Sequence, residues 1–187
     1  GPANSLIDLA IQKLTNNSQA YDYDGLIASK GVANQALIKS WLKESFFHLP
    51  APKSTGREQF GLDDLEKRWR QFGKKNYQDF ISTLTSFSAA IVAQEIHNLR
   101  LKESINPVEL VVAGGGCNNP IMMKEINLRC QGLSIKKIEE YGIPNQAREA
   151  LSFALLAWWH LLKYSGNSPS VTGAKKSMVL GVCAYPG

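Results

Sequence analysis

The stretch 109-ELVVAGGGCNNPIMMKEI-126 decides the fold, because an apolar run leads through three consecutive glycines into the start of a helix. Residues 108–113 are nearly all apolar, which is typical of a strand covered on both faces. Asn119 is well placed as the N-cap of the following helix, with Pro120 at its first position. Glycine loses more conformational freedom on folding than any other residue. The glycines at 114–116 therefore predict a place where the backbone comes close to something else, commonly a nucleotide.

The rest of the chain has mainly helical periodicity. Apolar residues recur at helical spacing over residues 5–14, with Asn4 in the N-cap position. Further helices are expected over residues 34–44, 62–70, 76–102 and 145–163, and the last of these is apolar enough to be mostly buried. Residues 134–142 and 177–185 are expected to form strands. Strand, helix, strand and helix in this order indicate an α/β layer with parallel pairing.

The position of the glycines suggests what they do. In open α/β sheets, ligands bind beyond the carboxyl ends of the strands, and unpaired amides at a helix start suit the ribose and phosphates of a nucleotide. The turn is not a P-loop, because no Lys followed by Ser or Thr comes after it, and it lacks the GxGxxG spacing of a Rossmann fold. A tight structural turn explains three glycines equally well.

Charge and its distribution bear on whether the chain binds nucleic acid. The chain has 187 residues with a net charge of +5, which permits an acidic partner. Its densest basic run, residues 67–75, interleaves cations with Trp69 and Phe72, as some nucleic-acid-binding surfaces do. The acids Asp63, Asp64 and Glu66 adjoin this run. We therefore interpret it as the end of an amphipathic helix whose aromatics face the core and whose cations face water, and we expect no nucleic-acid partner.

Cysteine and histidine usage gives no sign of a disulfide framework or a metal site. The chain has three cysteines and three histidines, all widely spaced. An odd number of separated cysteines suits reduced thiols in the cytoplasm. We expect no membrane contact, because no apolar stretch is long enough to span a bilayer and no signal peptide is evident at the first residues given.

A strand that ends in three glycines, followed by a polar pair, proline and an amphipathic helix, resembles the adenosine-binding turn of the superfamily of actin, sugar kinases and heat-shock chaperones. Within it, the whole chain resembles the anhydro-N-acetylmuramic acid kinase family. The similar blocks, in order, are GPANSLID (1–8), YDYDGLIASKG (21–31), PKSTGRE (52–58), GGGCNNP (114–120), EEYG (139–142), EALSFALLAW (149–158) and SPSVTGA (168–174).

The resemblance implies an α/β fold, namely the C-terminal lobe of an actin-like, ribonuclease-H-like ATPase with a mixed sheet, flanking helices and a helix-rich insertion. Residues 1–187 would form the nucleotide-binding lobe of a two-lobed cytoplasmic sugar kinase, whose N-terminal lobe is absent from this chain. That family uses ATP and Mg²⁺ to phosphorylate anhydro-N-acetylmuramic acid, a recycled cell-wall sugar, while water opens the anhydro ring. A homodimer is expected.

Several residues of this chain match functional positions of the family. The residues that match the adenosine turn are Gly114, Gly115, Gly116, Asn118 and Asn119. Those that match a segment entering the phosphate side of the cleft are Gly1, Pro2 and Asn4. The resemblance thus implies that two distant parts of the sequence meet around one nucleotide.

Two acids are further candidates. Asp8 lies one helical turn after Asn4 and could hold a magnesium-bound water, since Mg²⁺ keeps several waters and takes few protein ligands. A salt bridge or simple solvation explains Asp8 equally well. Glu149 matches a family acid near the sugar, although an acid at a helix start also compensates the helix dipole.

Other features leave alternatives open. Lys53, Thr55 and Arg57 lie in a loop that either contacts an anion or is an ordinary surface loop. The hydroxyls of residues 168–174 either line the cleft or cap neighbouring elements. The resemblance places the general base on a segment outside this chain, so we expect no sugar phosphorylation by the chain alone. A nucleotide-binding module without transfer activity and a purely structural partner domain are the alternative functions.

Overall fold

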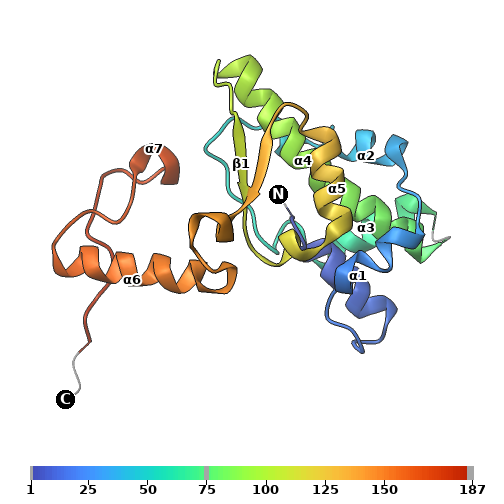
Figure 1. Cartoon of the computed structure of the whole chain (residues 1–187), viewed down its shortest axis with the longest axis horizontal. Coiled ribbons are helices and arrows are strands. Elements are labelled where there is room, and N and C mark those ends of the chain that lie inside the picture. The colour runs from blue at the N-terminus through green and yellow to red at the C-terminus, as the bar shows by residue number, and fades with distance from the viewer. Residues whose placement is uncertain (1, 74–75, 185–187) are drawn as a thin grey trace. The chain divides into compact units, whose positions relative to one another are not determined.

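The computed structural model describes residues 2–73 and 76–184, which divide into two compact units (Figure 1). The first unit contains the described residues of Gly1–His48 and Thr55–Lys137. The second contains those of Leu49–Ser54 and Ile138–Gly187. Gly1, which was predicted to contact the nucleotide, lies outside the described residues. No described helix is both long and apolar enough to cross a membrane.

The first unit contains the helices that the sequence pattern predicts. They are α1 (Ser5–Leu14), α2 (Gln35–Trp41), α3 (Leu62–Phe72), α4 (Tyr77–Lys102) and α5 (Pro120–Arg129). Short 3₁₀ turns cover Tyr23–Gly25, Ala28–Lys30, Ser45–His48 and Gly115–Asn118. Helix α2 ends at Trp41, three residues before the expected end at Glu44, and the chain continues in turns.

Side-chain caps explain where three of these helices begin. The side-chain oxygen Oδ1 of Asn34 accepts the Leu37 amide at 3.1 Å, and Oδ1 of Asn76 accepts the Gln78 amide at 2.9 Å. Asn119 accepts two amides at the start of α5, as its position predicted. The expected cap at Asn4 is wrong: its backbone is already helical and its side chain makes no capping bond. Ser5 instead donates its hydroxyl to the Pro2 carbonyl at 2.8 Å.

Helix α4 is the centre of the hydrophobic core. Its side chains Phe80, Ile81, Leu84 and Phe87 are buried, together with small ones such as Thr83, Thr85 and Ala89. Small side chains let neighbouring backbone pack closely: a Cβ on Gly31 would lie 2.1 Å from the Gln78 carbonyl oxygen of α4. Helices α1, α2 and α5 all pack against α4, and α5 runs beside it in Figure 1. One long helix therefore holds the elements that carry the site.

Arg68 of α3 contradicts the expectation that the cations of the basic run face water, because its side chain is 0% exposed. Its Nε donates to Asp64 and its Nη2 to Glu44, both at 2.8 Å. The guanidinium lies 4.9 Å from the ring centre of Trp41 and 4.7 Å from that of Phe87. The aromatics of the run do face the core, since Trp69 packs against Phe80 of α4. Lys74 and Lys75, at the end of the run, are outside the described residues.

The two strands of the first unit pair in parallel, as predicted. Strand β1 (Glu109–Val112) lies beside β2 (Ser134–Lys137) in the register Glu109 to Ser134, with α5 as the connection. The expectation that β1 is covered on both faces is wrong in this chain, because Val111 is 45% exposed. Within the described residues the sheet has two parallel strands, so the larger mixed sheet that the resemblance implied is not seen there.

The second unit contains α6 (Arg148–Leu161), the short α7 (Pro169–Thr172), 3₁₀ turns at Ile138–Tyr141 and Asn145–Ala147, and irregular segments. Two expectations fail here. Helix α6 has no buried residue, and Trp158 is 56% exposed, because the unit contains too few elements to cover an apolar helix. Residues 177–184 form no strand; their backbone instead bonds to the preceding loop and helix, as in the Leu180 carbonyl 2.8 Å from His160 Nδ1.

Candidate functional site

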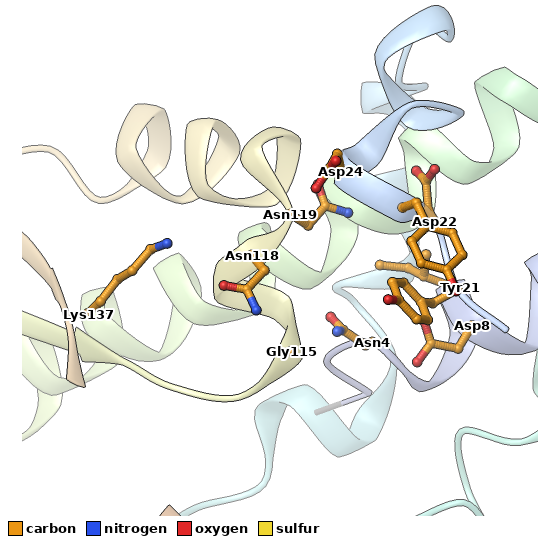
Figure 2. Close-up of a pocket in the computed structure, with 11 residues that line it drawn as sticks. Asn4, Asp8, Tyr21, Asp22, Asp24, Gly115, Asn118, Asn119 and Lys137 are labelled. Carbon is orange, nitrogen blue, oxygen red and sulfur yellow. The ribbon is translucent and has the colours of Figure 1, made fainter. Parts of the chain in front are cut away.

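A cavity of about 620 Å³ lies in the first unit where three segments of the chain meet (Figure 2). Its lining residues are Asn4, Ile7 and Asp8 of the first segment, residues 21–24 of the second, Gly115, Asn118 and Asn119 of the third, and Lys137 at the end of β2. Figure 2 shows Tyr21 and Asp8 on one side and Asn118 and Lys137 on the other, with Asn4 between them. A volume of this size is ordinary for a site that binds a small molecule.

The three glycines after β1 have three different physical roles. Gly114 has a φ of +88°, a left-handed conformation that glycine adopts without strain. A Cβ on Gly116 would lie 2.9 Å from Asn4 Oδ1 and 3.1 Å from Met122 Sδ, so close packing explains that glycine. A Cβ on Gly115 would meet only Asn4 Nδ2, at 3.8 Å, which is an ordinary contact. Gly115 is therefore the glycine whose missing side chain leaves space in the cavity.

The start of α5 does not offer the free amides that we expected from the sequence. Pro120 has no N–H, and the amides of Ile121 and Met122 donate to Asn119 Oδ1 at 3.0 and 3.1 Å. The Met123 amide donates to the Asn119 carbonyl at 3.0 Å. These bonds satisfy the first turn of the helix, which in other proteins binds phosphate. The expectation of unpaired amides at this helix start is therefore wrong, and the turn beside it presents Gly115 and Asn118 to the cavity.

Residues 21–24 also line the cavity, although no site role was predicted for them from the sequence. Asp22 is buried, and its two carboxylate oxygens accept the amides of Ile27 and Ala28 at 2.8 and 3.0 Å. Gly25 has a φ of +64°, and a Cβ there would lie 2.5 Å from Asn119 Oδ1. The block YDYDG, with a buried acid and a positive-φ glycine, was the available signal.

Asp8 has the most perturbed carboxyl group of the cavity wall. Burial raises the pKa of Asp8 to about 6, although the positive charge of Arg57 opposes this rise. Arg57, one of the candidate anion contacts, does not line the cavity, but its charge lowers the pKa of Asp8, which does. No cluster of three or more possible metal ligands is found among residues 2–73 and 76–184. The described residues therefore form no complete set of metal ligands. A single carboxylate such as that of Asp8 can still bind a cation through the cation's own water molecules.

The pKa of Asp8 predicts how stability depends on pH. The folded chain favours the neutral form of the Asp8 carboxyl. The contribution of this group to the free energy of unfolding is therefore largest below pH 4 and is lost as the pH rises past about 6. The change from Asp8 to Asn removes this loss, worth about 1–2 kcal/mol after allowance for solvent screening. In urea unfolding, the free energy of unfolding of the Asn variant should therefore rise relative to that of the original chain between pH 4 and pH 7.5. The exposed Asp63→Asn serves as control, and an equal gain there would contradict the prediction.

The remaining candidates are not among the residues that line this cavity. Glu149 is exposed in the first turn of α6, and Arg148 Nη2 lies 3.3 Å from its Oε1. Lys53 belongs to the second unit. Thr55 belongs to the first unit and donates its hydroxyl to Gln59 at 2.8 Å. In the 168–174 segment, Thr172 donates to the Ser168 carbonyl at 2.9 Å, a local bond within α7.

Comparison with known proteins gives a consistent result. Residues 1–186 match the family model described as anhydro-N-acetylmuramic acid kinase. A protein of that name from Prochlorococcus marinus (strain MIT 9313) is 53% identical over 186 residues, covering 100% of this chain and 49% of the relative. Another, from Synechococcus sp. (strain CC9902), is 50% identical over 188 residues, covering 100% of this chain and 50% of the relative. The chain spans about half the length of the curated relatives it matches.

Proposed function

Because this chain belongs to the anhydro-N-acetylmuramic acid kinase family, we propose that it provides the ATP-binding half of an enzyme that phosphorylates anhydro-N-acetylmuramic acid. In this reaction water opens the anhydro ring and the sugar hydroxyl accepts the phosphoryl group, which gives N-acetylmuramic acid 6-phosphate. The actin-like lobe, the cytoplasmic location and the homodimer belong to the same proposal.

One observation carries the proposal: the cavity gathers five of the residues assigned to the nucleotide side, from two distant parts of the sequence. They are Asn4, Asp8, Gly115, Asn118 and Asn119. Gly114 and Gly116 set the backbone and the packing that place Gly115 at the wall. We propose that the ribose of ATP lies against Gly115 and that the amides of Asn4 and Asn118 bind its polar groups.

The chain's own residues would contribute position and charge, which make up nearly all of the catalysis in phosphoryl transfer. Mg²⁺ would neutralise charge on the transferred phosphate. The carboxylate of Asp8 suits a water of its hydration shell, because it is partly buried, faces the cavity and carries a charge above pH 6. We propose that Glu149 serves the sugar side, where its exposed carboxylate is available to a hydroxyl group. The general base would come from the half that the chain does not contain.

Two binding and transfer experiments test the function. In the full-length protein, of the relatives' size, calorimetry should detect ATP binding, and labelled ATP should give a labelled sugar phosphate. The 187-residue chain supplied alone should give no measurable product, because the base is missing. The alternative, a nucleotide-binding module without transfer activity, predicts ATP binding by the full-length protein and no sugar phosphate. Absence of ATP binding by the full-length protein would contradict both.

A further inference from the structure

Two tyrosines stand side by side on the wall of the cavity, and no role has been assigned to them so far. Tyr21 and Tyr23 are 46% and 51% exposed, although both line the cavity. Their ring centres are 4.1 Å apart and their planes are inclined by 39°. Figure 2 shows Tyr21 across the cavity from Asn118. An exposed aromatic pair beside a cavity leaves apolar ring surface in contact with water unless a ligand covers it.

The backbone that carries these rings is held from both sides. Asp22, between the two tyrosines, is buried and binds the amides of Ile27 and Ala28 through both carboxylate oxygens. Gly25 fixes the other end, because it packs against the side chains of Asn119 and Ile121 without room for a Cβ. The rings are therefore placed relative to the glycine turn before any ligand arrives, which lowers the entropic cost of binding.

The charges on this side of the cavity suit an uncharged part of a ligand. Asp22 and Asp24, which adjoin the tyrosines in the sequence, also line the cavity, so phosphate groups beside them would be repelled unless a cation lay between. The first amides of α5 are already satisfied by Asn119 and cannot hold phosphate. A hydrogen bond with Tyr23 is the main cause that raises the pKa of Tyr21, so the Tyr21 hydroxyl stays neutral. The tyrosine pair thus offers neutral aromatic surface within an acidic wall.

We propose that Tyr21 and Tyr23 form the contact for the nucleobase, with the base stacked against the tyrosine pair and the ribose beside Gly115. This inference rests on the proposed function, since it assigns one part of the nucleotide to one part of the same cavity. Aromatic stacking of a base contributes about 1–3 kcal/mol in other proteins, which corresponds to roughly five-fold to more than a hundred-fold in affinity. The phosphates then point away from the tyrosines and from Asp22 and Asp24, which leaves Asp8 to the hydrated Mg²⁺ of the proposed function.

Calorimetry on the full-length protein tests this assignment with three probes: ATP, adenosine and tripolyphosphate. Tyr21→Ala should weaken the binding of ATP and adenosine about tenfold, and should leave the binding of tripolyphosphate unchanged within twofold. Tyr23→Ala should act in the same direction. Tyr21→Phe keeps the ring and should remain within about threefold of the original affinity, which separates stacking from a hydroxyl hydrogen bond.

Tyr77 provides the matched control, because it is also 46% exposed but does not line the cavity. Tyr77→Ala should leave all three affinities unchanged. If the original protein binds ATP and both alanine variants bind it equally well, the nucleobase contact is overturned while the proposed function stands. An equal loss for tripolyphosphate, or a selective loss for the anhydro sugar used as a fourth probe, would also overturn it. If the original protein binds neither ATP nor adenosine, the proposed function fails and this assignment fails with it.

Discussion

Replacing Gly115 with valine should lower the affinity for ATP at least tenfold, about 1.4 kcal/mol, while the fold is kept. Gly115 has no positive φ, and its nearest neighbour beyond an added Cβ would be Asn4 Nδ2 at 3.8 Å, so a side chain fits the local structure. The valine methyl groups would then occupy the space in which we place the ribose. Calorimetry measures the affinity, and thermal unfolding checks that the protein remains folded.

The neighbouring glycine provides the contrast. A Cβ at Gly116 would lie 2.9 Å from Asn4 Oδ1, so Gly116→Ala should lower the melting temperature of the protein as well as its affinity for ATP. Gly115→Val should change the affinity with little effect on the melting temperature. Unchanged ATP affinity in a folded Gly115→Val protein would remove the glycine turn from the nucleotide site.

The second large effect concerns stability: Arg68→Ala should lower the free energy of unfolding of the chain by about 3–5 kcal/mol. The substitution leaves the Glu44 and Asp64 carboxylates without their buried partner, and it opens a cavity between Trp41 and Phe87. Contacts of the guanidinium with these rings add to the loss. Urea unfolding followed by circular dichroism measures the change.

Two further variants separate the causes of this loss. Arg70→Ala, on the same helix but exposed, should change stability by less than about 0.5 kcal/mol. Arg68→Met fills the space but leaves Asp64 without Arg68 and Glu44 with only Lys67, so its stability should fall between that of the original chain and that of Arg68→Ala. A loss below about 1 kcal/mol for Arg68→Ala would mean that the buried ion pairs add little, since their desolvation then cancels their attraction.

Features encoded within a few residues were predicted well from the sequence. The helices that begin near residues 34 and 76 follow from periodic apolar runs, and the start of α5 follows from Asn119 as its predicted cap. The parallel pairing of β1 and β2 follows from an apolar run on each side of a helix. In these cases the residues that set the structure are near neighbours in the sequence, so the pattern contains the whole cause.

Features that depend on distant partners were not predictable in the same way. Residues 177–184 have the composition of a strand, but a strand exists only where another backbone accepts its hydrogen bonds. Arg68 has the sequence context of a surface cation, and its burial depends on Glu44, which lies 24 residues away. At the site, the sequence indicated the glycine turn but not that residues 21–25 pack against it, because that contact depends on Asn119 occupying the space beside Gly25.

The contact between Gly25 and Asn119 also restricts how this site can change during evolution. A side chain at position 25 would collide with Asn119 Oδ1, 2.5 Å away, and would have to adopt a left-handed backbone. A smaller residue at 119 would make room, but it would give up the two bonds that cap α5. Each single replacement is therefore harmful by itself, and the pair can be exchanged only through an unfavourable intermediate. The two positions form an epistatic pair, so a lineage that carries both residues tends to keep both.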